Sequence, residues 1–516
     1  MESVKRMAKT VLVVLFINVF SRALALLASI LITSYYGAND LTSGYSFALS
    51  VANTFTSIIG TALTTAVIPI YMELNNKKGR KEADKFINST LSLTLLIGAV
   101  LVIIGVLFSP LLINFSKSSD KGFSLFSMRM LLPTVLFMSM GFIFTGVLQS
   151  KDHFYAPAMV SLPSSLVSIL YIVLFSSYFG LTGLVIATLG GFLFQALFLV
   201  MPLLKSGFRF ALSFDYKDES IKEIFILSGP VLIGVAAYQI NILTNGTIAM
   251  AYDSSKYVIL SNMQNLGIQI VLTLVIATVS VIYPKLTKSA IDHDFEGFSK
   301  LLFTALSSAT IMLIPLSVLF MSLSYEIVDI VYGYGKFTPD DVMIGSTIFS
   351  IYAISVIGIA LKESCDRAFY ALKITKVSAL NGVFIMIVNI ILTVAFVRLW
   401  GLNGIALSYA LASLLGGFVI FFLISKKIDI CMIKNFFIVL IKSLVAGAFM
   451  YLTIYLLTGF FAKMGFPTTK LYVIVRTGIE FIAGACVYVL VLLLERTREL
   501  KSFLEFLPHK KEAMKD

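Results

Sequence analysis

Long apolar runs separated by short polar segments make up most of this chain of 516 residues. A helix needs about 20 mostly apolar residues to cross the hydrocarbon core of a bilayer. Fourteen runs meet or approach this requirement, near 10–35, 44–72, 86–114, 124–150, 154–178, 182–204, 223–250, 256–284, 298–323, 341–371, 377–399, 402–425, 433–459 and 471–494. The pattern therefore predicts an all-α membrane protein with about 14 transmembrane helices.

Composition and charge agree with this class. Hydrophobic residues make up 58% of the chain and charged residues only 13%, where a soluble domain carries about 25% charged residues. With the N-terminus in the cytoplasm, 28 Lys and Arg residues fall in segments on the cytoplasmic side and 7 on the opposite side. This bias follows the positive-inside rule and predicts that both termini are cytoplasmic. The net charge of +12 then reflects membrane orientation, and we expect no nucleic-acid partner.

The chain contains a long internal repeat. The tripeptide Phe-Tyr-Ala begins at Phe154 and again at Phe369, 215 positions later. After each copy, two apolar runs flank a Gly-Leu-x-Gly turn, at Gly180 and at Gly401. A pair of prolines about 85 residues upstream keeps the same offset of 215 positions, so the repeat is nearly gap-free between these landmarks.

The repeat predicts a duplicated architecture. Its parts are two six-helix bundles at 1–204 and 223–425, a polar cytoplasmic linker at 205–222, two additional helices at 433–494 and a cytoplasmic tail at 495–516. An even number of helices in each copy makes the two copies parallel in the membrane. Transporters built in this way bind substrate between their halves near the midplane and rock about that site.

Arg22 is the sharpest candidate for a functional residue. It lies about twelve residues from either end of the first run, roughly 18 Å along a helix from each membrane surface. A charge at the bilayer centre costs about 2.5–3.5 kcal/mol on insertion scales, so it normally faces a water-filled cavity or a partner. We interpret Arg22 as a substrate-binding residue in a cavity. The alternative is an internal ion pair with a carboxylate of another helix.

A charged cluster at Lys362, Glu363, Asp366 and Arg367 ends the tenth run. Lys362 with Asp366 and Glu363 with Arg367 form two pairs of opposite charge at i,i+4 spacing, which places each pair on one face of a helix. We interpret the cluster as a gate that closes the cytoplasmic side of the cavity. Substrate contact and a plain ion-pair network at the membrane surface are the alternatives.

Amide side chains within the spans form a weaker set of candidates. We predict that Asn53, Gln264 and Asn265 contact the substrate. Hydrogen bonding between helices is the alternative role for any of them. We find no acidic residue in the middle of a span, so we expect no proton or sodium site built from carboxylates.

Signatures of enzymes are mostly missing from the sequence. The three histidines have no metal-ligand spacing, the three cysteines are scattered, and no phosphate-binding G-x-x-x-x-G-K-[ST] motif occurs. We therefore predict a protein that is not an enzyme and holds no metal or cofactor. A coupling ion or the membrane potential remains open as the driving force.

Three segments resemble the MurJ (MviN) lipid II flippases, which belong to the multidrug/oligosaccharidyl-lipid/polysaccharide exporter superfamily. They are Ser21-Arg22 with Tyr-Gly-Ala at 36–38, Tyr-Gly-Lys-Phe-Thr at 334–338, and Arg-Ala-Phe-Tyr-Ala-Leu-Lys-Ile-Thr-Lys at 367–376. The resemblance covers essentially the whole chain. It implies a V-shaped pair of six-helix bundles around a central cavity, with the last two helices forming a groove for a lipid tail.

The resemblance also implies a function. Such a protein flips an undecaprenyl-pyrophosphate-linked peptidoglycan precursor across the bacterial cytoplasmic membrane by alternating access. Its partners would be this lipid-linked oligosaccharide, membrane lipids and enzymes of cell-wall synthesis. Arg22 matches an arginine of the family's cavity. Ala28, Thr56 and Asn265 stand where the family has three further arginines, which leaves the exact lipid-linked substrate open.

Two alternative functions follow from the same residues. A flippase for another lipid-linked oligosaccharide, or a drug exporter of the same superfamily, would share the fold and the cavity. A non-transporting membrane scaffold would keep the helices but would need no water-accessible cavity around Arg22.

Overall fold

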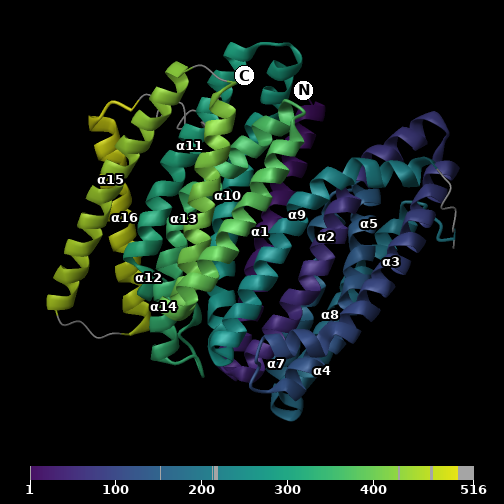
Figure 1. The fold of residues 1–516 in the computed structure, drawn as a ribbon, viewed down its shortest axis with the longest axis horizontal. Coiled ribbons are helices and arrows are strands. Elements are labelled where there is room, and N and C mark those ends of the chain that lie inside the picture. Colours follow the sequence, from purple (N-terminus) through teal and green to yellow (C-terminus); the bar gives the residue numbers. More distant parts are fainter. Residues whose placement is uncertain are drawn as a thin grey trace. The chain divides into compact units, whose positions relative to one another are not determined.

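The computed structural model describes residues 2–151, 153–211, 213, 219–427, 430–464 and 469–497. Within these ranges the regular structure is entirely helical (Figure 1). The helices are α1 (Glu2–Tyr36), α2 (Asp40–Lys77), α3 (Arg80–Phe115), α4 (Lys121–Leu131), α5 (Thr134–Ser150), α6 (Tyr155–Ala158), α7 (Leu162–Leu174), α8 (Ser176–Lys205), α9 (Glu219–Tyr252), the 3₁₀ turn η1 (Ser254–Lys256), α10 (Tyr257–Ile291), α11 (Phe295–Ser322), α12 (Ser324–Tyr332), α13 (Pro339–Ala371), α14 (Thr375–Ser425), α15 (Ile430–Lys463) and α16 (Lys470–Leu494).

This arrangement confirms the prediction of an all-α membrane protein. Each predicted run lies in one helix or in consecutive short helices. In the described part of the chain, 11 helices are long and apolar enough to cross a membrane. The predicted run at 124–150 is broken into α4 and α5 at Pro133, whose ring removes a backbone donor. The short helix α12 was not predicted, because its nine residues are too few to produce a long apolar run.

The Gly-Leu-x-Gly turns have one conformation in both copies of the repeat. Gly180 kinks α8 with φ 56° and ψ −151°, and Gly401 kinks α14 with φ 59° and ψ −135°. Residues with a Cβ rarely adopt such a positive φ, so glycine is required at both kinks. Three positions later, a Cβ on Gly404 would collide with the backbone oxygen of Phe396. The equal geometry of the two turns agrees with the predicted repeat.

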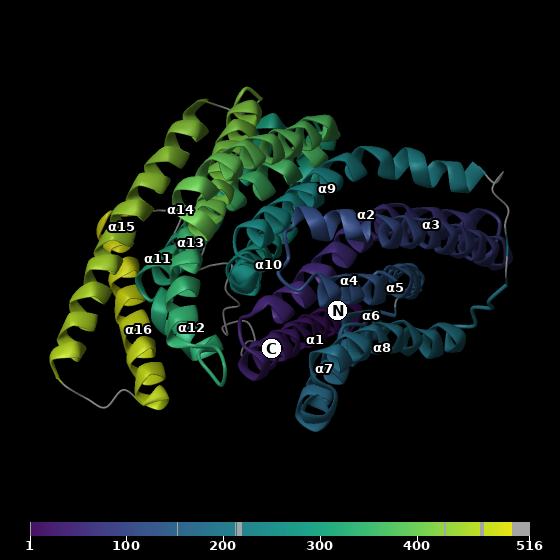
Figure 2. The ribbon, with the colours of Figure 1, turned by 60° about the horizontal axis from the view of Figure 1, so that its bottom comes forward.

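The described chain divides into two compact units, which are residues 1–258 with 334–338, and residues 259–333 with 339–516. In the first unit, α2, α3, α5 and α8 pack around a core that includes Phe86, Phe144 and Phe208. Helix α9 belongs to this unit, where it packs along α2 (Figure 2). The boundaries predicted from the repeat place α9 in the second half, and those boundaries stay a prediction.

The first part of the predicted linker at 205–222 is held against α3. The side chain of Asn88 donates a hydrogen bond to the backbone oxygen of Arg209 (3.0 Å) and accepts one from the backbone nitrogen of Ala211 (3.2 Å). Phe208, directly before Arg209, is buried in the core of the first unit. Linker residues 212 and 214–218 lie outside the described residues, as does most of the predicted tail, at 498–516.

In the second unit, α13 and α14 cross at glycines. A Cβ on Gly358 of α13 would collide with the backbone of Ser413, and one on Gly417 of α14 would lie 2.5 Å from the backbone oxygen of Gly358. Small residues allow helices to approach this closely inside a membrane, where dispersion forces at the contact replace the hydrophobic effect. Helices α15 and α16 pack against each other and against α11 at the edge of this unit (Figure 1).

We expect Gly358→Ala to destabilise the protein by about 1–3 kcal/mol, because the clash is with backbone atoms that cannot rotate away. Gly478→Ala in α16 is the matched control, since no atom lies within 4 Å of the added methyl group. It should be neutral or slightly stabilising, because alanine favours helix. Thermal unfolding in detergent measures both, and equal stability of the two variants would contradict the close crossing.

Candidate functional site

Arg22 of helix α1 has no partner among the described residues. Its side chain is exposed, and no hydrogen bond or ion pair joins it to another residue in the described ranges. The internal ion pair considered above as the alternative is therefore not formed there. Asn18, one turn earlier on the same side of the helix, is also exposed and was missed by the sequence reasoning, which treated α1 as a uniform apolar run.

Exposure on α1 is of two kinds. Phe16, Phe20 and Leu27 are exposed on the opposite side of the helix from Arg22 and Asn18. An apolar exposed face suits contact with lipid, whereas a face with a guanidinium and an amide needs water or a polar ligand. Buried Ser21 and Ala28 lie between the two faces on one side, where α1 packs on α6 and α7.

The other predicted substrate residues are accessible to different degrees. Asn53 on α2 is half-buried, and on α10 Gln264 is half-buried while Asn265 is exposed. Thr56, at which the family resemblance implies an arginine, is buried and donates a hydrogen bond to the backbone oxygen of Ala52 (2.9 Å). Substrate contact by Asn53, Gln264 and Asn265 stays a prediction. Several other asparagines of the spans are also buried, as expected for contacts between helices, among them Asn241, Asn245, Asn262, Asn381 and Asn389.

The predicted gate residues form a cluster at the C-terminal end of α13, but only one predicted pair exists. The ammonium of Lys362 lies 2.7 Å from a carboxylate oxygen of Asp366 and 3.2 Å from one of Glu363. The predicted Glu363–Arg367 pair is wrong: the guanidinium of Arg367 instead lies over the ring of Tyr283 on α10, 5.8 Å from its centroid. Lys362 contacts both carboxylates, and Arg367 joins α13 to α10 through the ring of Tyr283.

The expectation that no span carries an acidic residue in its middle is wrong. Glu480 lies near the middle of α16 and is fully buried. Arg476, one turn earlier, lies 3.4 Å from it and also pairs with Glu326 of α12. The signal was present in the sequence, because Arg476 and Glu480 have i,i+4 spacing inside the last apolar run.

Two of the segments that carry the family resemblance touch each other in the first unit. The backbone nitrogen of Lys336 donates to the backbone oxygen of Ser34 (2.7 Å), and its ammonium lies 5.8 Å from the ring centroid of Tyr35. The approach is close enough that a Cβ on Gly335 would collide with Ser34, and one on Gly37 would lie 3.2 Å from Lys336. Both glycines also have a positive φ, so the two motifs are one structural feature.

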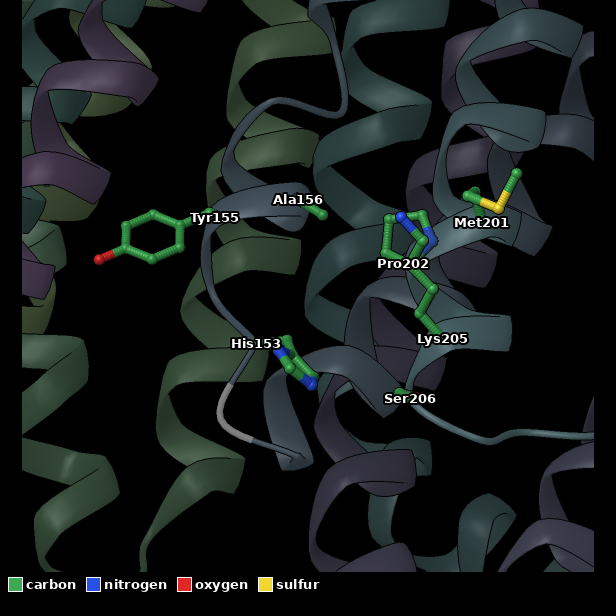
Figure 3. A pocket seen from close by; sticks show the side chains of 7 residues that line it. All are labelled: His153, Tyr155, Ala156, Met201, Pro202, Lys205 and Ser206. Carbon is green, nitrogen blue, oxygen red and sulfur yellow. The ribbon is translucent and has the colours of Figure 1, made fainter.

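A pocket of about 300 Å³ opens where the connection from α5 to α6 meets the end of α8. Figure 3 shows its lining, with Tyr155 extending away from the other side chains: His153, Tyr155, Ala156, Met201, Pro202, Lys205 and Ser206. Lys151 donates a hydrogen bond to the Ser206 hydroxyl (3.4 Å). Burial lowers the pKa of Lys151, and Asp84 opposes that shift. None of the predicted substrate or gate residues lines this pocket.

Comparison with known proteins settles the family. The family model "Lipid II flippase MurJ" matches residues 32–475. The chain belongs to the MurJ family of lipid II flippases. The predicted family resemblance is thus confirmed, and the chain is a multi-pass membrane protein of a transporter family.

Curated MurJ-family relatives match over most of their length. The lipid II flippase MurJ of Thermosipho africanus is 27% identical over 439 residues, which cover 84% of this chain and 88% of the relative. The probable lipid II flippase MurJ of Borreliella burgdorferi is 23% identical over 493 residues, covering 94% of this chain and 97% of the relative.

Solved structures share the fold. A lipid II flippase MurJ in an inward closed conformation aligns with TM-score 0.77 at 22% identity, covering 94% of this chain and 99% of the other. An inward-facing multidrug resistance MATE family transporter of the MOP superfamily aligns with TM-score 0.68 at 15% identity, covering 78% and 93%.

We expect Asp366→Asn to destabilise the protein by about 2 kcal/mol, since it removes the buried carboxylate that lies closest to the ammonium of Lys362. Glu363→Gln, at the longer and more exposed contact, should cost less than about 1 kcal/mol. Thermal unfolding compares the two. Lys362→Met added to Asp366→Asn should recover part of the loss, and a simple sum of the single effects would argue against the pair.

Proposed function

We propose that this chain is a flippase that moves lipid II, an undecaprenyl-pyrophosphate-linked peptidoglycan precursor, across the membrane. Membership of the MurJ family supports this function. The observation that carries it is the exposed side chain of Arg22, which lies within a membrane span and has no partner among the described residues. A cation without a partner inside a membrane span needs water around it. A flippase has to hold water inside the membrane, because it moves a polar head group across the bilayer.

The chemistry of the substrate fits Arg22. A guanidinium can donate two parallel hydrogen bonds to phosphate oxygens, and charged hydrogen bonds of this kind are about twice as strong as neutral ones. Asn53, Gln264 and Asn265 would add amide donors to the pyrophosphate and the sugars. Alternating access would then expose this group of residues to each side of the membrane in turn.

Orientation, location and energetics complete the proposal. The distribution of Lys and Arg supports cytoplasmic termini in a bacterial inner membrane. In that orientation the cluster at Lys362, Glu363, Asp366 and Arg367 closes the cytoplasmic side as a gate. Partners are the lipid-linked oligosaccharide, membrane lipids and enzymes of cell-wall synthesis. A coupling ion or the membrane potential would supply the free energy.

Labelling of single cysteines tests whether water reaches the Arg22 face. We expect Asn18→Cys to react with a charged, membrane-impermeant maleimide, because a thiol in a wet cavity ionises and reacts. Phe20→Cys, on the opposite face, should be unreactive in lipid. The native cysteines are replaced by serine in both variants. Equal lack of reaction in both would favour the non-transporting scaffold.

Substitution of Arg22 tests the substrate contact. We expect Arg22→Ala to lower lipid II translocation in proteoliposomes by about 10-fold to 100-fold, the loss of one charged hydrogen-bonding contact. Arg22→Lys keeps the charge but not the forked geometry, and it should fall between wild type and Arg22→Ala. Equal insertion and thermal stability of the three proteins is the control. Unchanged translocation in Arg22→Ala would refute the role of this residue.

A second candidate substrate is favoured by the residues at Ala28, Thr56 and Asn265, which stand where the family resemblance places arginines. Fewer cations would suit a lipid-linked oligosaccharide that depends less on its pyrophosphate for binding. Rescue of a bacterial strain depleted of its own lipid II flippase separates the two. Growth supports lipid II, while failure to grow with normal protein levels supports the other oligosaccharide.

A further inference from the structure

Helices α12 and α16 meet at one cation and two carboxylates. Arg476 of α16 pairs through Nη2 with Glu326 of α12, and its Nε lies 3.4 Å from a carboxylate oxygen of Glu480. The Arg476 and Glu326 side chains are 16% and 15% exposed, whereas Glu480 is not exposed at all. The group therefore has one negative charge in excess when both carboxylates are ionised.

Among the described residues, Glu480 lacks a well-placed hydrogen-bond donor. Neither of its oxygens accepts a hydrogen bond, and the Nε of Arg476 is too poorly placed to donate one. The hydroxyl of Thr458 on α15 is near enough to stabilise the ionised carboxylate, but it donates to the backbone oxygen of Ile454 (3.0 Å). Among the described residues, its shell contains one cation, and that cation is already engaged by Glu326.

Other charged groups on the packed helices are directed elsewhere. On α15, Lys434 and Lys463 are exposed, and Lys442 donates to the backbone oxygen of Glu495 (2.6 Å). The charged residues of α11, Glu296 and Lys300, form their own pair in its first turns. The other titratable groups on the buried side of α16 are Tyr472, which is half-buried, and Tyr488, whose hydroxyl donates to the backbone oxygen of Ile311 (3.0 Å).

An ionised carboxylate that lacks both water and a donor is costly, and a bound proton removes the charge. We propose that Glu480 is a proton-binding site, and that its protonation state decides whether Arg476 is committed to Glu326. With Glu480 neutral, Arg476 belongs to Glu326 and joins α12 to α16. With Glu480 ionised, the two carboxylates compete for one guanidinium, and this contact weakens.

The rest of the α12–α16 contact limits the movement to one end. Lys470 at the start of α16 lies 2.5 Å from a carboxylate oxygen of Asp329 and donates to its backbone oxygen (3.0 Å). That pair is partly exposed and does not involve Glu480. The proton therefore controls the beginning of α12, near Glu326, while the part around Asp329 stays attached.

Infrared titration of the full chain in lipid nanodiscs tests the proton site. We expect a neutral-carboxyl band at neutral pH, where ordinary carboxyl groups are ionised, that is lost in Glu480→Gln and kept in the control Asp329→Asn. Glu326→Gln should shift the titration of this band to lower pH, because Arg476 then serves Glu480 alone. The proposal would be overturned if Glu480→Gln removed no neutral-carboxyl band at any pH between about 5 and about 9.

Spin-label distances test the mechanical consequence without relying on transport. Labels at Tyr325 of α12 and Ile482 of α16, both exposed, report the contact in a background with the native cysteines replaced by serine. We expect the wild-type distance distribution to broaden as the pH rises and Glu480→Gln to keep the low-pH distribution. A wild-type distribution that is independent of pH, or a pH dependence that survives in Glu480→Gln, would refute the coupling.

Discussion

The absence of water from hydrocarbon governs the charged side chains of this protein. A charge within the membrane needs a partner, a proton or a local pool of water. Lys362 has two carboxylate partners, and Arg476 is shared between Glu326 and Glu480. Arg22 has no protein partner among the described residues. Ion pairs thus account for Lys362 and Arg476, whereas the guanidinium of Arg22 needs water or a polar ligand.

The same constraint acts on the backbone. Hydrocarbon accepts only chains whose amides are satisfied internally, so an interruption of a helix needs its own hydrogen bonds. At the kink of α8, the backbone oxygen of Gly180 accepts from the hydroxyls of Tyr171 (2.7 Å) and Tyr36 (3.0 Å). Tyr36 is the last residue of α1 and adjoins Gly37, which contacts Lys336. Tyr36 therefore connects the kink at Gly180 to the contact between Gly37 and Lys336.

The sequence predicted those features that depend on long averages over the chain. Runs of about 20 apolar residues identified the spans, and the exact offset between Phe154 and Phe369 identified the repeat. The Gly180 and Gly401 turns were also predictable, because only glycine suits their φ. Helix α12 was not predicted, because its nine residues are too few for a helical periodicity that can be distinguished from the pattern of a loop.

Pairing of charges was harder to predict than their positions. The i,i+4 rule places Glu363 and Arg367 on one face, but it cannot rank that contact against Lys362 or against the ring of Tyr283 on another helix. Averaging over an apolar run likewise concealed Glu480, because one carboxylate hardly changes the mean of 24 residues at 471–494. A charge within a span is informative because its transfer into hydrocarbon costs free energy. Each such residue therefore has to be considered separately from the mean hydropathy of the span.

Arg22 and Glu480 illustrate two solutions to this cost with different consequences. A guanidinium remains charged at any pH that a cell meets, so Arg22 needs water or an anion permanently. A carboxylate loses its charge when it binds a proton, so Glu480 can remain buried and still change its protonation state. The first property suits a residue that holds an anionic substrate, and the second suits a residue that responds to its surroundings. The permanent charge of arginine therefore suits position 22, and the titratable charge of glutamate suits position 480.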